Sequence, residues 1–260
     1  MKSFLYLALV GLIVVTSAVP VAAVSVDRVS TFSCAEVTEI PQIECEALVA
    51  FYYSTNGPGW WHSDYWLVSA TPSNWYGVTV ANGHVTKLHL TENRLSGSLP
   101  PELVNLTILS ELSLDANQIG GRIPPELGTM FNLNILSLTY NHFEGDIPAE
   151  LGNLNNLRIL GIGGEFPSSG LTGHIPAELG NLLNLTGLYI ENSYISGGIP
   201  PELGNLANLQ TLYLYNNQLT GSIPASLGNL HTLIDLELNF NRLNGIIPSE
   251  LGDMVTLKTI

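Results

Sequence analysis

The chain has 260 residues, enough for one or two ordinary domains, and a net charge of −14 from 22 acidic and 8 basic residues. Hydrophobic residues make up 45% of it and charged residues only 12%, so the chain is too apolar to be disordered and can build a large core. Its acidic surface repels phosphate groups, which excludes nucleic acid and anionic lipid as expected partners and leaves cationic and neutral partners open.

Residues 1–23 have the composition of an export signal. Lys2 supplies a positive start, an unbroken apolar run extends from Phe4 to Val15, and small residues lead to Ala23, as in a secretory signal peptide. An uncleaved membrane anchor is the alternative, because the apolar stretch nearly reaches Val26. We predict cleavage after Ala23 and a mature chain that is secreted or held at the cell surface.

Residues 24–84 differ in composition from the remainder of the chain, and we expect them to form an N-terminal cap. They contain both cysteines of the chain, Cys34 and Cys45, which either pair or stay as free thiols. We predict a disulfide, because an exported chain meets oxidising conditions and the closed loop stabilises the fold by ~3 kcal/mol. Two cysteines without suitably spaced histidines cannot fill a tetrahedral zinc site, so we expect no metal.

A helix and an aromatic cluster are expected within the cap. Leu48 and Phe51 fall on one face of a helix predicted over residues 44–54, and the Asn-Gly-Pro-Gly run at 56–59 ends it. All four tryptophans come after this run, at Trp60, Trp61, Trp66 and Trp75. We interpret them as a lid over the open core of the first repeat, with a carbohydrate-stacking site as the alternative. Asn-Gly at 82–83 suits a tight turn between two short strands.

A 24-residue period begins after the cap. Prolines recur at spacings of 24, 24, 28, 24, 24 and 24 residues, at Pro100, Pro124, Pro148, Pro176, Pro200, Pro224 and Pro248. Each follows an aliphatic residue and precedes a leucine by three positions. Self-similarity at a fixed period is typical of a solenoid, in which single units lack a core and stacking buries a continuous column of side chains.

One unit, residues 209–230, shows how each repeat is expected to fold. Leu212 and Leu214 alternate as on a strand, which places both leucines on one face and their neighbours on the other. Asn217 ends the strand, and its amide can bond backbone groups of the turn. The equivalent asparagines are predicted to stack as a ladder, formed by Asn93, Asn117, Asn141, Asn217 and Asn241.

The unit LxxLxxLxLxxNxLxGxIPxxLGxL resembles the plant-type leucine-rich repeat of plant receptor-kinase ectodomains, polygalacturonase-inhibiting proteins and some bacterial secreted proteins. The resemblance covers residues 85–260, as seven near-complete repeats and the start of an eighth. It implies a solenoid of the α/β repeat class, a curved right-handed coil with a parallel sheet on its concave face. Residues 47–51 and 75–79 resemble the small helical and aromatic N-terminal cap of such proteins, although Ser73 and Val80 stand where plant members carry a cysteine pair.

The repeat pattern breaks in two neighbouring units. The fourth repeat carries four extra residues in a Gly163–Gly170 loop and lacks the ladder asparagine, and Ser193 replaces the asparagine in the fifth. We therefore expect an interrupted ladder, with the loop either a tolerated surface insertion or a ligand contact. The sequence stops at Ile260 without a polar terminal cap, so we expect a longer protein to continue beyond it.

Catalytic and cofactor motifs are missing from the sequence. The six histidines are scattered, without HExxH or another metal spacing, and no GxSxG occurs. We therefore expect a recognition module rather than an enzyme, with a protein, a peptide or a cell-surface or cell-wall glycan as partner and no cofactor. One alternative is the truncated ectodomain of a receptor kinase, joined to a membrane by its missing part or by an uncleaved N-terminal segment; another is a secreted inhibitor of a polysaccharide hydrolase.

The ligand site is predicted from the residues that point outward from the concave sheet. The central column reads His89, Ser113, Ser137, Gly161, Tyr189, Tyr213 and Glu237, and the next reads Thr91, Asp115, Thr139, Gly163, Glu191, Tyr215 and Asn239. Tyrosines, which offer apolar area with a polar tip, gather with carboxylates toward the C-terminal end. We predict ligand contacts at Tyr189, Glu191, Tyr213, Tyr215 and Glu237, with Asp115 and His89 on the same face; the alternative is an ordinary solvated sheet.

Overall fold

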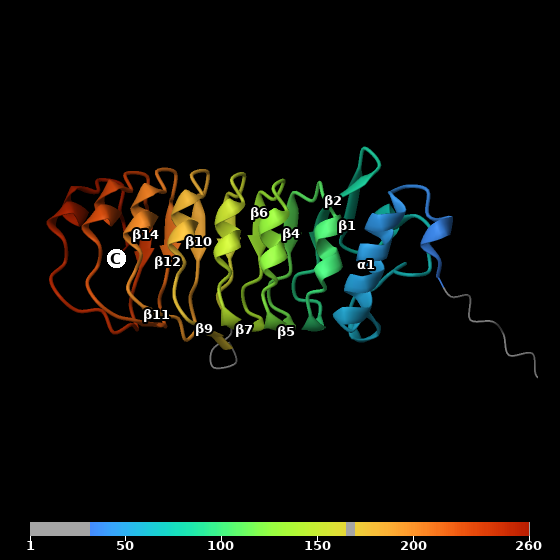
Figure 1. Cartoon of the computed structure of the whole chain (residues 1–260), viewed down its shortest axis with the longest axis horizontal. Helices are drawn as coiled ribbons and strands as arrows, with labels where there is room; N and C mark the ends of the chain where they lie inside the picture. The colour runs from blue at the N-terminus through green and yellow to red at the C-terminus, as the bar shows by residue number, and fades with distance from the viewer. Residues whose placement is uncertain (1–31, 165–169, 260) are drawn as a thin grey trace, which may run out of the picture. The chain divides into compact units, whose positions relative to one another are not determined.

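The computed structural model describes residues 32–164 and 170–259. The predicted signal peptide and the middle of the Gly163–Gly170 loop lie outside the described residues. From Phe32 onward the chain forms one compact unit. It is an elongated solenoid in which successive repeats lie side by side, with the cap at one end (Figure 1).

Short strands from successive repeats line one face of the solenoid as an eight-stranded sheet, in the order β1-β2-β4-β6-β8-β10-β12-β14. Their bounds are β1 Val78–Ala81, β2 His84–His89, β4 Glu111–Ser113, β6 Ile135–Ser137, β8 Ile159–Gly161, β10 Gly187–Tyr189, β12 Thr211–Tyr213 and β14 Asp235–Glu237. The first two strands pair antiparallel across the predicted turn at 82–83, and every later pair is parallel. The predicted parallel sheet is therefore confirmed.

A second set of strands comes after the ladder position in the first six repeats. Four pair in the order β3-β5-β7-β9, and β11 pairs with β13. Their bounds are β3 Ser96–Ser98, β5 Gln118–Arg122, β7 His142–Asp146, β9 Gly170–Thr172, β11 Ser196–Gly197 and β13 Gln218–Leu219. These short strands carry the chain away from the concave sheet toward the return side of each turn (Figure 1).

Each repeat returns through a short 3-10 helix that starts just after its proline. The helices span Pro101–Asn105, Pro125–Thr129, Ala149–Asn153, Ala177–Asn181, Pro201–Asn205, Ala225–Asn229 and Ser249–Asp253. Neighbouring helices pack closely: a Cβ added to Gly128 would lie 2.3 Å from the carbonyl oxygen of Glu150. This close approach explains why glycine follows the buried leucine in almost every repeat.

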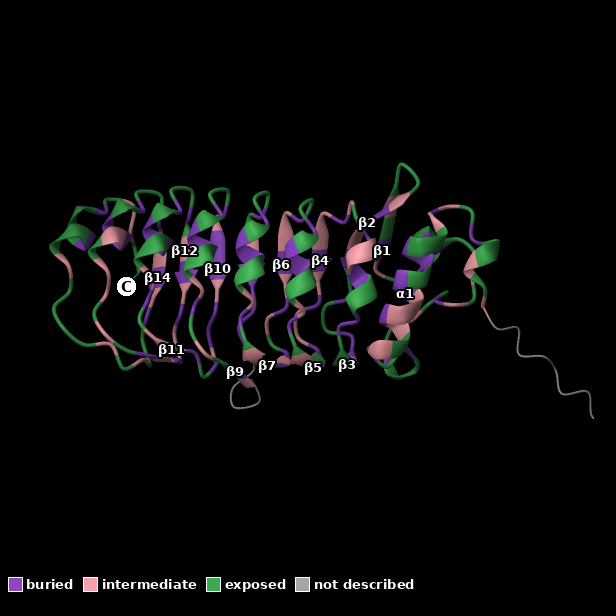
Figure 2. Ribbon diagram, viewed as in Figure 1, coloured by how far each residue is buried: buried purple, intermediate pink, exposed green. Residues whose placement is uncertain are grey.

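The core is a column of leucines that runs the length of the solenoid. Leu112, Leu160 and Leu188 occupy equivalent places on adjacent or nearby strands, in register, and all are fully buried. Buried segments recur in every repeat, while exposed residues lie on the 3-10 helices and loops (Figure 2). Because each leucine packs against its counterparts in the units on either side, stability is shared along the stack.

The asparagine ladder forms as predicted and is interrupted where the repeat pattern lacks its asparagine. The Asn117 amide nitrogen donates to the carbonyl oxygens of Leu90 and Leu114 at 2.8 and 2.9 Å, and its oxygen accepts from the Asn93 and Leu95 backbone N–H groups, both at 2.9 Å. In the fifth repeat the buried Ser193 hydroxyl donates to the Glu191 carbonyl oxygen at 3.3 Å instead. The ladder thus satisfies buried backbone groups that would otherwise stay unpaired.

The cap is tied to the first repeat by its α-helix. Helix α1 spans Gln42–Ser54, two residues longer at its start than predicted, and the predicted disulfide between Cys34 and Cys45 is present. The buried Glu44 carboxylate accepts from the Val85 backbone N–H at 2.8 Å and contacts His84 Nδ1 at 2.6 Å. These contacts fix the helix against strand β2.

The interpretation of the tryptophans as a lid is right for three of the four. Trp60, Trp66 and Trp75 are buried and pack on one another, with ring centroids 5.1 and 4.9 Å apart. Trp61 is 63% exposed and takes no part in the lid. The Trp61 backbone N–H donates to the Asn93 carbonyl oxygen at 3.2 Å. This bond ties the Trp61 backbone to the first repeat, and its ring lies outside the aromatic stack.

Candidate ligand-binding surface on the concave face

The two outward columns of the concave sheet are in the predicted register. His89 pairs with Ser113, Ser113 with Ser137, and Ser137 with Gly161. Gly161 then pairs with Tyr189, Tyr189 with Tyr213, and Tyr213 with Glu237. The residues predicted as ligand contacts therefore share one face of one sheet, but they do not all lie together.

Five of them form a cluster, which we call the tyrosine patch: Tyr189, Glu191, Tyr213, Tyr215 and Glu237. They come from β10, β12 and β14 and the residues just after these strands. The Tyr189 and Tyr213 rings meet edge to face with centroids 5.4 Å apart, and those of Tyr213 and Tyr215 lie 6.0 Å apart. The three rings are half-buried, so they present apolar surface that a ligand can cover.

Glu191 is the unusual member of the patch. It is only 4% exposed, and its Oε2 atom has no hydrogen-bond partner among the described residues. It packs against Gly163, where an added Cβ would lie 2.7 Å from the Glu191 Cδ atom and 2.8 Å from its carbonyl oxygen. Only glycine at 163 therefore leaves room for the carboxylate. A buried, unpaired carboxylate is costly when ionised.

Burial raises the pKa of Glu191 to about 7, against the lowering effect of a backbone hydrogen bond and with further upward contributions from the charges of Glu237 and Asp115. Burial likewise raises the pKa of Tyr215 to about 12, and the charge of Glu191 and the side chain of Tyr140, which comes from three repeats earlier, add to this effect. The pKa of Tyr213 is also raised, first by burial and then by Glu237. All these shifts have the direction expected where negative charge is poorly compensated.

Basic side chains elsewhere on the sheet lie beside other carboxylates. Among the described residues, Lys87 forms an ion pair with Glu111, His89 also contacts Glu111, and His84 contacts Glu44; none of these contacts includes a residue of the tyrosine patch. The patch therefore combines half-buried aromatic rings with an uncompensated carboxylate, which favours a cationic group on a ligand.

His89 and Asp115 belong to a different part of the face, where they have partners within the chain. His89 Nε2 lies 2.9 Å from Glu111, whose pKa is lowered chiefly by a hydrogen bond from Lys87. Asp115 Oδ1 accepts from the Ser137 and Thr139 hydroxyls at 2.5 and 2.7 Å. These two side chains are engaged in holding neighbouring strands together.

Two residues near these surfaces were missed by sequence reasoning. Tyr140, which has a left-handed backbone with φ of 54°, affects the pKa of Tyr215 from three repeats away. Glu111 pairs with Lys87 across β2 and β4. The register of the columns could have revealed Glu111, since it lies directly opposite Lys87. No sequence pattern indicated Tyr140, because the repeat shows which residues are adjacent in a column and Tyr140 affects the pKa of a residue three repeats further along.

Membrane-spanning and metal-binding features were not found in the described part of the chain. Within residues 32–164 and 170–259, no helix has the length and apolarity that a membrane crossing requires. In the same residues, no group of three or more histidine, cysteine, aspartate or glutamate side chains is placed to hold a metal ion.

Known structures with the same fold include plant receptor ectodomains. A PEPR1–AtPEP1 complex is 33% identical with a TM-score of 0.76, over 84% of this chain and 31% of that one. The ectodomain of the Arabidopsis thaliana receptor kinase GASSHO1/SCHENGEN3, in complex with CASPARIAN STRIP INTEGRITY FACTOR 2, is 34% identical with a TM-score of 0.65, over 84% and 29%. The chain thus spans less than a third of the length of either.

A plant ice-binding protein shares the fold at 22% identity and a TM-score of 0.71, over 86% of this chain and 79% of that one. None of the curated proteins matches the sequence. The Leucine Rich Repeat family profile matches residues 84–106, 109–130, 132–154, 184–206, 208–230 and 232–254, more than half of the chain. The chain therefore belongs to the leucine-rich repeat family and has the ectodomain fold of the plant receptors that it resembles.

Proposed function

We propose that this chain is an extracellular recognition module that binds a peptide, or an extended protein segment, through the tyrosine patch. The observation that carries the proposal is the unpaired, buried carboxylate of Glu191 beside three half-buried tyrosines. A binding-competent partner supplies a lysine or arginine side chain, whose charge compensates Glu191 and whose aliphatic stem covers the rings.

The charge of the chain supports this choice of ligand. At a net charge of −14, the chain attracts cationic partners, and the patch itself holds Glu191 and Glu237, neither of which joins an ion pair among the described residues. A cation beside Glu191 stabilises the ionised form, so ligand binding is coupled to the release of a proton. Affinity for a basic ligand should therefore increase as the pH rises through about 7, which is the pKa of Glu191 in the folded protein without ligand.

The comparisons support a peptide rather than a glycan at this site. The similar receptor kinase HAESA, 29% identical over 83% of this chain, was crystallised in complex with the peptide hormone IDA and the co-receptor SERK1. An extended peptide can cross several strands of a sheet and use pockets for alternate side chains. Secretion, inferred from residues 1–23 alone, is part of the proposal.

A receptor ectodomain is the second candidate function. The observation that favours it is the likeness to receptor ectodomains, of which this chain spans 31%, 29% and 40% in three cases. In that case the tyrosine patch is the sensor surface of a longer protein. The two candidates share the ligand chemistry and differ in what lies beyond residue 260.

The test is a binding screen with synthetic peptides of about ten residues, long enough to cross most of the sheet. We expect selection of peptides that carry lysine or arginine, with affinity higher at pH 8 than at pH 6. Tyr213→Ala combined with Tyr215→Ala should weaken the best peptide more than about threefold, or ~0.7 kcal/mol.

Ser113→Ala, on the same column but outside the patch, is the matched control and should leave affinity unchanged. Equal weakening by Ser113→Ala and by the double variant would argue against the patch as the centre of the site. So would a screen without preference for basic peptides.

A further inference from the structure

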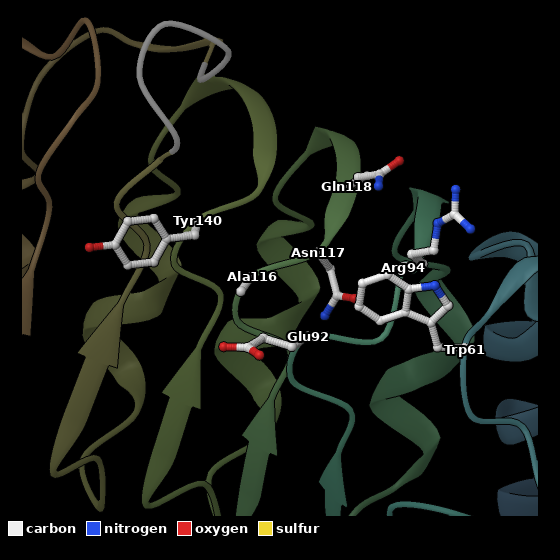
Figure 3. Close-up of a pocket in the computed structure, with 7 residues that line it drawn as sticks. All are labelled: Trp61, Glu92, Arg94, Ala116, Asn117, Gln118 and Tyr140. Atoms are coloured by element: carbon white, nitrogen blue, oxygen red, sulfur yellow. The ribbon is translucent and has the colours of Figure 1, made fainter.

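A hollow lies at the rim of the solenoid, between the cap and the turns that come after the concave strands. It has a volume of about 370 Å³ and is lined by Trp61 of the cap, by Glu92 and Arg94, by Ala116 and Gln118 of the next repeat, and by Tyr140 of the repeat after that (Figure 3). We call it the rim pocket. It shares no lining residue with the tyrosine patch.

Trp61 is held in place although its ring is exposed. Its backbone N–H donates to the Asn93 carbonyl oxygen at 3.2 Å. The next residue, His62, donates its N–H to Asn93 Oδ1 at 2.7 Å and accepts from Asn93 Nδ2 at 2.8 Å. The first rung of the asparagine ladder therefore fixes the segment that displays the indole. An exposed but anchored aromatic ring loses little entropy when a ligand covers it.

The floor of the rim pocket exists because one residue is small. Ala116 adopts a left-handed backbone with φ of 53°, and the equivalent residues of other repeats include Tyr140 and Phe240, with φ of 54°. The neighbouring Asn117 is buried and already uses its amide in the ladder. Alanine thus opens a space that a larger side chain at this position would fill.

Polar groups with unused hydrogen-bonding capacity surround this floor. The Arg94 guanidinium lies over the Trp61 ring, 5.7 Å from its centroid. Neither Arg94 nor Glu92 belongs to an ion pair among the described residues, and the Gln118 side chain is exposed. Figure 3 shows Glu92 on one side of the hollow and Arg94 with Gln118 on the other. Donors and an acceptor thus face one space beside an aromatic plane.

We propose that the rim pocket binds a pyranose ring of a neutral oligosaccharide. A sugar ring presents a face of C–H groups to the indole, while its hydroxyl groups donate to the Glu92 carboxylate and accept from Arg94 and Gln118. The volume lies near the lower end of the ~300–1,000 Å³ range of small-molecule sites, which suits one or two rings. The net charge of −14 repels polymers of uronic acids, so the sugar is uncharged.

The test is a titration of the protein with neutral hexasaccharides of β-glucan, mannan and chitin type, followed by tryptophan fluorescence and by calorimetry. Because Trp60, Trp66 and Trp75 are buried, a change in emission on binding reports Trp61. We expect at least one hexasaccharide to saturate, and Trp61→Ala to weaken it about tenfold or more.

A second variant tests the hollow itself. Ala116→Tyr should fill the pocket and abolish binding while leaving Trp61 in place, and the fold should accept it because Tyr140 occupies the same backbone conformation one repeat later. Phe131→Ala, which removes another exposed aromatic ring outside the pocket, is the control and should bind as the unchanged protein does.

Failure of all three hexasaccharide types to bind would overturn the proposal. So would unchanged affinity in Trp61→Ala or Ala116→Tyr, a preference for polygalacturonate over the neutral sugars, or capture of basic peptides at Trp61 in place of sugars. A Tyr213→Ala variant, which leaves Tyr140 and its contact with Tyr215 in place, should keep its sugar binding, and this separates the rim pocket from the tyrosine patch.

Discussion

The two halves of the concave face differ in whether a buried or half-buried carboxylate has hydrogen-bond donors. Asp115 and Glu191 occupy the same column, three repeats apart. Asp115 accepts from Ser137 and Thr139 of the following repeat, including the Thr139 backbone N–H at 3.1 Å. At the places equivalent to Ser137 and Thr139, the repeat after Glu191 carries tyrosines, and Glu191 Oε2 stays unpaired among the described residues. Short hydroxyl side chains satisfy a carboxylate that tyrosines only shield from water.

The halves also differ in how charge is compensated. In the N-terminal half, Glu111 forms an ion pair with Lys87 and contacts His89, so this carboxylate is compensated within the chain. The tyrosine patch has no such pair in the part of the chain that the structure describes. The Glu111 carboxylate therefore has a cationic partner within the chain, whereas the carboxylates of the tyrosine patch can still pair with a cationic group of a ligand.

The largest expected effect tests whether the two halves share an equally packed core. Leu188→Ala and Leu112→Ala each remove a fully buried leucine from the same column. Each should lower the free energy of unfolding by ~2–5 kcal/mol, because buried leucines leave cavities. Chemical denaturation measures both. A much smaller loss for Leu188→Ala would mean that the C-terminal half is loosely packed and that its tyrosines help to hold the fold.

The next effect comes from the raised pKa of Glu191. Its folded-state pKa of about 7 exceeds the ordinary value of 4.5, so the unfolded chain releases this proton at lower pH than the folded protein does. The contribution of Glu191 to stability therefore falls as the pH rises from about 4.5 to about 7 and is constant above that range. The full loss is roughly 3 kcal/mol.

Glu191→Gln should therefore stabilise the protein at pH 8, by up to roughly 3 kcal/mol, and change little at pH 4. Denaturation midpoints of both proteins across this pH range give the comparison. Glu191→Gln that destabilises the protein at pH 8 would show that the carboxylate is ionised and well compensated in the folded state.

Asp115 should behave in the opposite way. Asp115→Ala leaves the hydroxyls of Ser137 and Thr139 and a backbone N–H without their acceptor, at a cost of ~1–3 kcal/mol in the free energy of unfolding. The same denaturation assay at pH 7 measures it. If this variant and Glu191→Gln changed stability in the same direction, the contrast between the two halves of the face would be wrong.

Much of this arrangement could be predicted from sequence because it depends on the repeat. The 24-residue period determines which residues share a column, and so predicted the leucine core, the asparagine ladder and the adjacency of Tyr189, Tyr213 and Glu237. The state of Glu191 was missed because it depends on side chains in the flanking repeats. Trp61 was grouped with the lid because four tryptophans lie close in sequence, and only the backbone path shows which one faces outward.

The smallest effect separates ligand binding from folding within the tyrosine patch. Tyr213 and Tyr215 are half-buried; their rings contact each other, and the Tyr213 ring also contacts that of Tyr189. Replacing both with alanine removes ring pairs worth about 1 kcal/mol of stability and creates no cavity in the core. Thermal unfolding should therefore shift far less than for Leu188→Ala, while binding of a basic peptide weakens. If stability fell as much as for Leu188→Ala, the rings would be structural, and weakened binding in that variant would no longer locate the ligand site.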